Sequence, residues 1–226
     1  MNSKAHLPKL LVFAGLAFTG LVLICVFING DIIRILSAKP DLKDGGFLSG
    51  EPCGPPCFLG ITPNVTTEEQ AVQILKAKGL YRNCHIFNNE DESGLRGAAC
   101  ADVEIAYYRS SDLVGSISFS PSQPITVEMV IAKYGNPDAV SVSTIWFNWE
   151  KQPTTSMGLI YDRIHAVVGL GEQESSTFYL TPTTRISAVG YSDQTFPSVR
   201  EYEAIAKYRS SWQGYGWYQE PQIPGE

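Results

Sequence analysis

An uncharged and almost wholly apolar run from Leu10 to Ile28 limits what this chain can fold into more than any other feature. A helix over this run, at about 1.5 Å rise per residue, is about 28 Å long, which is close to the hydrocarbon thickness of a bilayer. The sequence therefore predicts a cytoplasmic tail over residues 1–9 and a single transmembrane anchor over residues 10–29. The lipid bilayer is the first expected partner, and it is contacted through this anchor.

Two alternatives to an uncleaved anchor stay open. A cleaved secretory signal has a shorter apolar core followed by small residues, whereas the best exit here, Leu36-Ser37-Ala38, begins with a bulky residue. A lipoprotein would be acylated at Cys25, but Ile24 stands where such sites have a small residue. The length of the run and its flanks together favour the uncleaved anchor.

Four cysteines after the apolar run indicate the side of the membrane. An even number of cysteines is typical of disulfides formed outside the reducing cytosol, so the C-terminal part is expected to be extracytoplasmic, on a single-pass protein of the cell membrane. We expect the pairs Cys53–Cys57 and Cys84–Cys100, because the second bridge would join the two sides of a loop over residues 88–97. Closing a loop of about 15 residues in this way contributes about 3 kcal/mol.

Composition narrows the function classes. The 226 residues carry a formal net charge of −6, are 44% hydrophobic and 11% aromatic, and contain 18% charged residues. Such a chain can bury a core. It has no cluster of Lys and Arg, which argues against binding to a nucleic-acid backbone. We therefore expect a globular domain and no nucleic-acid partner.

The part of the chain after the anchor is expected to contain one domain between two irregular segments. A linker is predicted over residues 30–50, since Asp44-Gly45-Gly46 near its end is turn-rich. The extracytoplasmic α+β domain follows over residues 51–218. A Pro-rich flexible tail is expected over residues 219–226.

Secondary-structure signals predict the content of this domain. Capping residues indicate three helices, over residues 67–78, 126–134 and 199–209, the first with Thr66 and Glu69 as a capping box. Residues 81–108 are predicted to be β, with apolar and polar residues alternating over 102–107. Strands are also indicated over 114–119, 140–149, 159–170 and 185–191, with a β-bulge at 143–144. This order predicts an α+β fold of helices packed on antiparallel β-sheet, in two loosely repeated helix–strand units that follow the N-terminal transmembrane helix.

The second predicted helix carries a resemblance to known families. The residues Thr126–Val130 and Tyr134–Pro137 resemble the T-x-x-x-V…G-x-P opener of the β-lactamase-inhibitor-protein-like repeat and of the small outer-membrane assembly lipoproteins. Residues 60–75 resemble a divergent first copy. The resemblance implies helical hairpins on a curved antiparallel sheet and, because members with known roles bind other proteins, a binding module. The chain also resembles uncharacterised bacterial membrane-anchored proteins, which implies a location and no activity.

Motifs that carry chemistry are weak throughout the chain. The C-x3-C spacing at Cys53 and Cys57 differs from the C-x-x-C of thiol–disulfide oxidoreductases. Zinc binding by the cysteines with His85 or His165 lacks the ligand spacing of known zinc sites. The sequence also has no nucleophile elbow and no dinucleotide or phosphate-binding motif. We therefore expect no catalytic residue, no metal and no cofactor, with an extracytoplasmic hydrolase or thiol–disulfide oxidoreductase as the alternative function.

Aromatic residues are the remaining clue to function. Alternation in the strand over 140–149 puts Trp146 and Trp149 on opposite faces, so one large ring leaves the core. Either the C-terminal aromatic residues cover that ring, or they extend an exposed surface that binds an envelope protein or a glycan. The second alternative predicts a membrane-anchored extracytoplasmic protein-binding or envelope scaffold module. Its candidate contact residues are Trp146, Trp149, Trp212, Tyr215, Trp217 and Tyr218.

Overall fold

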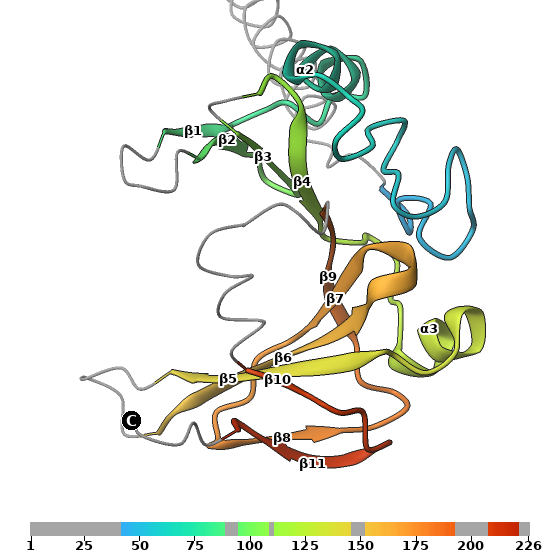
Figure 1. The fold of residues 1–226 in the computed structure, drawn as a ribbon, viewed down its shortest axis with the longest axis vertical. Coiled ribbons are helices and arrows are strands. Elements are labelled where there is room, and N and C mark those ends of the chain that lie inside the picture. Colours follow the sequence, from blue (N-terminus) through green and yellow to red (C-terminus); the bar gives the residue numbers. More distant parts are fainter. Residues whose placement is uncertain (1–41, 89–94, 109–110, 146–151, 193–207, 222–226) are drawn as a thin grey trace, which may run out of the picture. The chain divides into compact units, whose positions relative to one another are not determined.

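The computed structural model of the chain describes residues 42–88, 95–108, 111–145, 152–192 and 208–221 (Figure 1). The chain divides into two compact units, Met1–Pro40 and Asp41–Glu226, and all described residues belong to the second. The predicted cytoplasmic tail and the predicted anchor over residues 10–29 lie outside the described residues. Among the residues that are described, no helix is both long enough and apolar enough to cross a membrane.

The described residues form two α-helices, one 3-10 helix and eleven strands. The helices are α2 (Glu68–Ala77), α3 (Val127–Tyr134) and the 3-10 helix η1 (Asp162–Ile164). The strands are β1 (His85–Asn88), β2 (Leu95–Ala99), β3 (Val103–Tyr108), β4 (Val114–Phe119), β5 (Ala139–Ile145), β6 (Thr154–Tyr161), β7 (Ala166–Leu170), β8 (Thr177–Leu180), β9 (Ile186–Ser192), β10 (Arg209–Ser210) and β11 (Gly216–Gln219).

Nine of these strands form one large sheet, in the order β1-β2-β3-β4-β9-β7-β6-β5-β10. The strands β8 and β11 form a second, two-stranded sheet. Neighbouring strands are antiparallel in both sheets. The hydrophobic core draws its residues mainly from the large sheet and from the segments that lead into it.

The predicted α+β fold with helices packed on a sheet is therefore wrong. The described part of the chain is mostly β, and its two helices span only 10 and 8 residues. Each helix buries two apolar side chains, Ala71 and Leu75 in α2 and Val127 and Val130 in α3. Because these apolar stripes are narrow, each helix can bury little surface against a sheet. Strand residues therefore supply most of the core.

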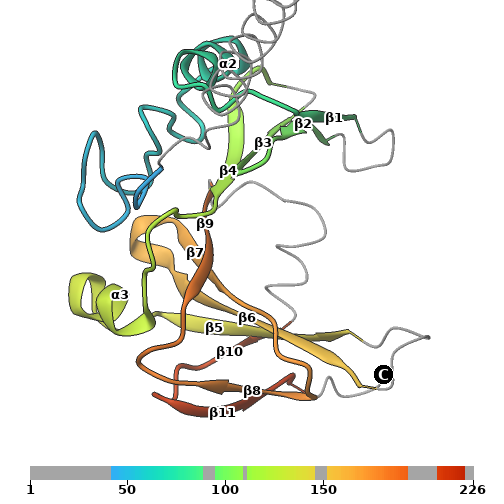
Figure 2. The same ribbon diagram turned by 180° about the vertical axis from the view of Figure 1, so that it is seen from behind.

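The large sheet consists of two halves that meet at β4 and β9 (Figure 2). The first half is α2 with β1 to β4, and the second half is α3 with β5, β6, β7 and β9. In each half the strands follow one another from the outer edge towards the centre. The central strands β4 and β9 pair from Ser116↔Ser192 to Phe119↔Val189, which makes one continuous sheet of the two halves.

A threonine begins each helix and ties it to the segment that enters a central strand. Thr67 pairs with Leu113, next to β4, and Thr126 pairs with Arg185, next to β9. Both threonine hydroxyls accept a hydrogen bond from the backbone N–H three residues later, which is the usual geometry of a helix N-cap. Both helices are therefore fixed at their first residue to the centre of the sheet.

The helix signals in the sequence are accurate to about one residue. In α2 the N-cap is Thr67, one residue after the predicted Thr66. The hydroxyl of Thr66 accepts a hydrogen bond from the backbone N–H of Thr62 at 2.9 Å, so it is used in the preceding turn. In α3 the predicted cap Thr126 and the end at Gly135, which has φ +78°, are confirmed.

The strand signals are accurate where alternation is regular. The alternation over 102–107 matches β3 to within one residue at each end, and the bounds predicted for β4 are confirmed. The segment predicted as one strand over 159–170 forms the end of β6, the turn at η1 and β7, and His165 closes this turn with φ +51°. The bulge predicted at 143–144 is wrong, because β5 and β6 pair without a shift as far as Ile145↔Thr154.

The structure describes only part of the C-terminal region for which the sequence predicts a helix. The helix predicted over 199–209 lies outside the described residues except at its end, where Arg209 begins β10. The strand β10 pairs with β5 through Arg209↔Ser141 and Ser210↔Val140, so it extends the second half of the sheet by one short strand.

Residues 42–50, predicted as the end of a linker, lie against the core. Leu42 and Phe47 are buried members of the core cluster. Gly45 has φ +62°, and a Cβ atom at this position would lie 2.4 Å from the ring of Phe119 in β4. The turn therefore needs a glycine for two reasons, its backbone conformation and its close approach to the central strand.

Asp44 organises the same turn. Its carboxylate accepts hydrogen bonds from the backbone N–H groups of Gly46, Leu48 and Ser49 and from the hydroxyl of Ser49, at 2.6 to 3.1 Å. Burial by itself raises the pKa of this carboxyl group, but the hydrogen bonds to the charged form outweigh it and the pKa lies below its usual value. Asp44 is therefore held as a carboxylate.

Candidate functional site

The two-stranded sheet of β8 and β11 carries two of the four C-terminal aromatic candidates, Trp217 and Tyr218. Its register pairs Trp217 with Tyr179 and Tyr218 with Phe178. Because side chains alternate along a strand, the two pairs lie on opposite faces. Phe178 and Tyr218 are buried, whereas the exposed fraction is 67% for Trp217 and 46% for Tyr179. One face of this sheet is part of the core, and the other presents two large rings to solvent.

Trp217 and Tyr179 form a cross-strand pair on the outer face. Their ring centroids lie 4.6 Å apart, and the ring planes are inclined by 43°. The backbone N–H and C=O of Tyr179 are hydrogen-bonded to the side chain of Gln173, so Tyr179 and Trp217 form a non-hydrogen-bonded pair. In such pairs the two side chains lie closer together than in hydrogen-bonded pairs. Tyr215, two residues before Trp217, is also exposed.

The side chain of Gln173 covers the outer edge of β8. Its amide oxygen accepts a hydrogen bond from the N–H of Tyr179 at 2.9 Å, and its amide nitrogen donates to the C=O of Tyr179 at 3.1 Å. The backbone of Gln173 itself pairs with Thr155 of β6. Gln173 therefore connects the small sheet to the second half of the large sheet and keeps Tyr179 in position.

Trp212 and Tyr218 anchor the C-terminal segment from the inner side. The hydroxyl of Tyr218 donates to the C=O of Gly214 at 2.6 Å and accepts from the N–H of Gln213 at 3.0 Å. Burial raises the pKa of Tyr218, and the bond from Gln213 offsets part of this rise. The ring of Trp212 lies 6.3 Å from that of Tyr218 and 6.1 Å from that of Tyr215.

The structure brings together four of the six aromatic candidates. Trp212, Tyr215, Trp217 and Tyr218 lie in one segment, whereas Trp146 and Trp149 lie outside the described residues. Sequence reasoning did not select Tyr179, the direct partner of Trp217. The available signal was the alternation of residues 177–180, Thr-Phe-Tyr-Leu, which sets the tyrosine on the face opposite to the phenylalanine and the leucine.

The predicted disulfides are confirmed. Cys53 is bonded to Cys57, and Cys84 is bonded to Cys100. The second bridge joins the residue before β1 to the residue after β2, so it closes the hairpin at the edge of the first half. All four cysteines of the described part of the chain are used in these bridges, which gives them a structural role.

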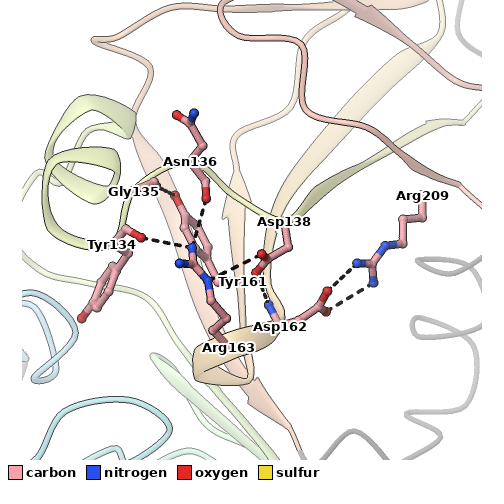
Figure 3. Close-up of polar contacts among 8 residues, drawn as sticks. All are labelled: Tyr134, Gly135, Asn136, Asp138, Tyr161, Asp162, Arg163 and Arg209. Atoms are coloured by element: carbon pink, nitrogen blue, oxygen red, sulfur yellow. Dashed lines mark hydrogen bonds and ion pairs between the residues drawn. The ribbon is translucent and has the colours of Figure 1, made fainter.

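A group of charged side chains surrounds the end of α3 (Figure 3). Arg163 donates from Nη2 to the carbonyl oxygens of Tyr134 and Asn136, both at 3.3 Å, and its Nε lies 3.5 Å from the carboxylate of Asp138. A cation at these carbonyls satisfies acceptors that the helix leaves open. This part of the group therefore caps α3.

The same group also holds β10 in place. Asp138 accepts a hydrogen bond from the N–H of Asp162 at 2.9 Å, and the carboxylate of Asp162 accepts two hydrogen bonds from Arg209 of β10, at 2.5 and 3.3 Å (Figure 3). Each carboxylate faces a guanidinium group. The arrangement joins the segment after α3, the turn at η1 and the strand β10.

Neither metal ligands nor known relatives indicate another site. Among the described residues, no three His, Cys, Asp or Glu side chains lie together in the arrangement of a metal site. Comparison with protein-family models, curated protein sequences and solved structures gave no significant match. The aromatic pair Trp217 and Tyr179 is therefore the candidate site on its geometry alone.

Proposed function

We propose that this chain is a protein-binding module that acts outside the cytoplasm and is held at a membrane by residues 10–29. The observation that carries the proposal is the exposed pair Trp217 and Tyr179 on the outer face of the small sheet. The two disulfides suit a compartment outside the reducing cytosol. An apolar run as long as Leu10 to Ile28 suits a membrane anchor.

Two exposed aromatic rings side by side are unfavourable in water unless a partner covers them. Burial of apolar surface contributes about 25 cal/mol per Å², and Trp and Tyr are enriched in binding hot spots. The hydrogen bonds of Gln173 at the edge and of Tyr218 beneath fix the backbone that carries the pair. Little conformational entropy is then lost on binding, which favours affinity.

The inclination of the two rings supports a protein partner over a glycan. A sugar ring stacks best on a flat aromatic face, whereas these two ring planes are inclined by 43° and do not form one flat face. An inclined aromatic pair suits the irregular side-chain surface of a protein, in which Trp and Tyr are common contact residues. An envelope protein is therefore the proposed partner, and a glycan is the other outcome of the test.

The test is photo-crosslinking in the full chain at its native membrane. A photoreactive phenylalanine analogue replaces Tyr215, which is exposed and lies two residues from Trp217. We expect one discrete adduct with a protein, and we expect the substitution Trp217→Ala to reduce its yield at least fivefold. The matched control places the analogue at Val65, which is 70% exposed and belongs to the turn before α2. No adduct is expected there.

Two results would contradict the proposal. One is the absence of a protein adduct from position 215. The other is an adduct whose yield is the same with Trp217 and with alanine at that position. Binding of a soluble glycan array that depends on Trp217, without a protein adduct, would replace the protein by a glycan.

A further inference from the structure

The small sheet has two outer edges, and side chains close the one at β8. In a non-hydrogen-bonded pair, the backbone N–H and C=O groups point away from the partner strand. Tyr179 and Trp217 form such a pair, so Tyr179 directs these groups to the outer edge of β8 and Trp217 to the outer edge of β11. At β8 the side chain of Gln173 bonds both groups of Tyr179, and the hydroxyl of Ser175 accepts from the N–H of Thr177.

The outer edge of β11 is open. The backbone groups of Trp217 have no hydrogen-bond partner within the part of the chain that the structure describes, and the same holds for Gln219, which faces the same edge. Both residues are exposed. Pro221, the next residue in this phase, has no N–H and ends the row of donors. β11 therefore presents two donors and two acceptors to which an extended segment can add as a further strand.

A neighbouring edge of the large sheet is closed in the same way as that of β8. The N–H of Thr144, near the end of β5, donates to the carboxylate of Glu220 at 2.8 Å. Glu220 directly follows Gln219, so the chain uses its side chain to close the edge of β5 and leaves the backbone of β11 unpaired. The open edge of β11 thus differs from the two edges beside it.

The exposed ring of Trp217 lies next to this open edge. Tyr179 of β8 contacts the ring from one side, with 4.6 Å between the ring centroids. A residue opposite Trp217 on an added strand would lie on the same outer face, with its Cβ about 4.5 to 5.5 Å from that of Trp217. Its side chain would then contact the ring from the other side. One added strand can therefore pair with the backbone of β11 and cover the aromatic pair.

The charges around the small sheet define that side chain. Residues 171–180 and 211–221 contain Glu172, Glu174 and Glu220 and no Lys or Arg. Burial raises the pKa of Tyr215, just before β11, and the nearby carboxylate of Glu128 raises it further. A cation is favoured in such surroundings. Arg combines a positive charge with a planar group that stacks on aromatic rings.

We propose that an extended segment of a partner protein adds to the outer edge of β11 and places an arginine against the ring of Trp217. This proposal rests on the proposed protein-binding function and gives its mode of binding and the chemistry of the partner. Pairing with Trp217 and Gln219 supplies affinity without regard to sequence. The aromatic ring and the surrounding carboxylates select the arginine.

The test is selection from a library of random twelve-residue peptides on the full chain in lipid nanodiscs. We expect enriched peptides with an arginine between residues of high β-propensity. Citrulline at that position keeps the shape and removes the charge, so synthetic copies that contain it should bind about three- to tenfold more weakly. Copies with N-methyl groups on alternate backbone nitrogens should bind about tenfold more weakly in one of the two phases, because strand addition uses alternate N–H groups.

Two proline variants provide the matched comparison in the protein. Gln219→Pro removes a donor from the open edge and keeps the hydrogen bonds between β8 and β11, so we expect about tenfold weaker peptide binding. Gly171→Pro introduces proline at another exposed position, where a Cβ atom would meet no atom within 4 Å, and should leave binding unchanged. Thermal unfolding checks that both variants fold. The N-methylated peptides test the same pairing on the wild type.

The outcomes distinguish this proposal from the proposed function. Peptides that need Trp217 but bind Gln219→Pro as tightly as the wild type would overturn strand addition and leave the protein-binding function standing. Equal binding of the arginine and citrulline copies would overturn the choice of arginine. Failure to enrich any peptide, or a dimer of the chain that Gln219→Pro abolishes, would overturn the partner segment. The absence of a protein adduct from position 215 would overturn both proposals.

Discussion

The two halves of the large sheet share one plan and differ at their outer edges. In both halves a threonine begins a short helix, pairs with the segment that enters a central strand, and is followed by strands that run from the edge to the centre. The first half then ends at β1, which pairs on one side within the described residues. The second half continues past β5 into β10 and carries the small sheet of β8 and β11.

The elements shared by the two halves form the core, whereas the candidate site lies on elements that only one half has. The shared elements account for the core and the central pairing of β4 with β9. The additions account for the candidate site, the exposed aromatic pair on the small sheet of the second half. The halves are also secured differently, the first by the disulfide Cys84–Cys100 and the second by the ion pairs around Arg163.

The largest loss of stability is expected at Gly45, which packs against the central strand β4. Gly45→Ala places a Cβ atom 2.4 Å from the Phe119 ring and 2.8 Å from the Phe58 ring, in a backbone conformation with φ +62°. We expect a loss of about 4 kcal/mol in the free energy of unfolding, measured in urea. Gly60→Ala, with φ +93° and no atom within 4 Å, should lose only about 1 kcal/mol. Equal losses in the two variants would contradict this account.

The next effect should fall on the first half. Replacing Cys84 and Cys100 together by Ser opens a crosslink with a sequence separation of 16, which should cost about 3 kcal/mol. The same change at Cys53 and Cys57, with a separation of 4, should cost about 2 kcal/mol. Hydrogen exchange measured by mass spectrometry should show the added loss of protection in β1 and β2. Loss confined to β5 and β6 would exclude this local role.

A smaller effect should fall on the second half. Arg163→Ala removes two hydrogen bonds to carbonyl oxygens at the end of α3 and an ion pair with Asp138, on a side chain that is largely exposed. We expect a loss of about 1 kcal/mol, with faster hydrogen exchange at the end of α3 and unchanged exchange in β1. Faster exchange in β1 would mean that the halves are not secured independently.

The smallest effect on stability is expected only at acidic pH, and it comes from Asp44. Hydrogen bonds hold the pKa of Asp44 below its unfolded value of about 3.9. The carboxylate therefore stabilises the fold above that value, and the contribution is lost as the pH falls through the folded-state pKa. Urea unfolding between pH 5 and pH 2 should show this decline in the wild type and a shallower one in Asp44→Asn. The same slope in both proteins would rule Asp44 out as its source.

Local signals in the sequence predicted local structure well. Thr126 and Gly135 mark the ends of α3 because a cap and a positive φ are decided within a few residues. The alternation of residues 102–107 and 114–119 predicted β3 and β4 for the same reason. The disulfide pairs were predicted from the even number of cysteines after the apolar run and from the loop between Cys84 and Cys100.

The fold class and the sites depend on pairings that no local pattern contains. The pairing of β4 with β9 joins residues that lie 70 to 76 positions apart in the sequence, from Phe119↔Val189 to Ser116↔Ser192. Tyr179 was missed because its partner Trp217 comes from a strand much later in the chain.

The side chain of Gln173 has a consequence for the solubility of this molecule. By bonding both backbone groups of Tyr179, one amide takes the place that a strand of a second copy would need. We expect Gln173→Ala to open this position of β8 to a strand of a second copy and so to lower the protein concentration at which light scattering detects self-association.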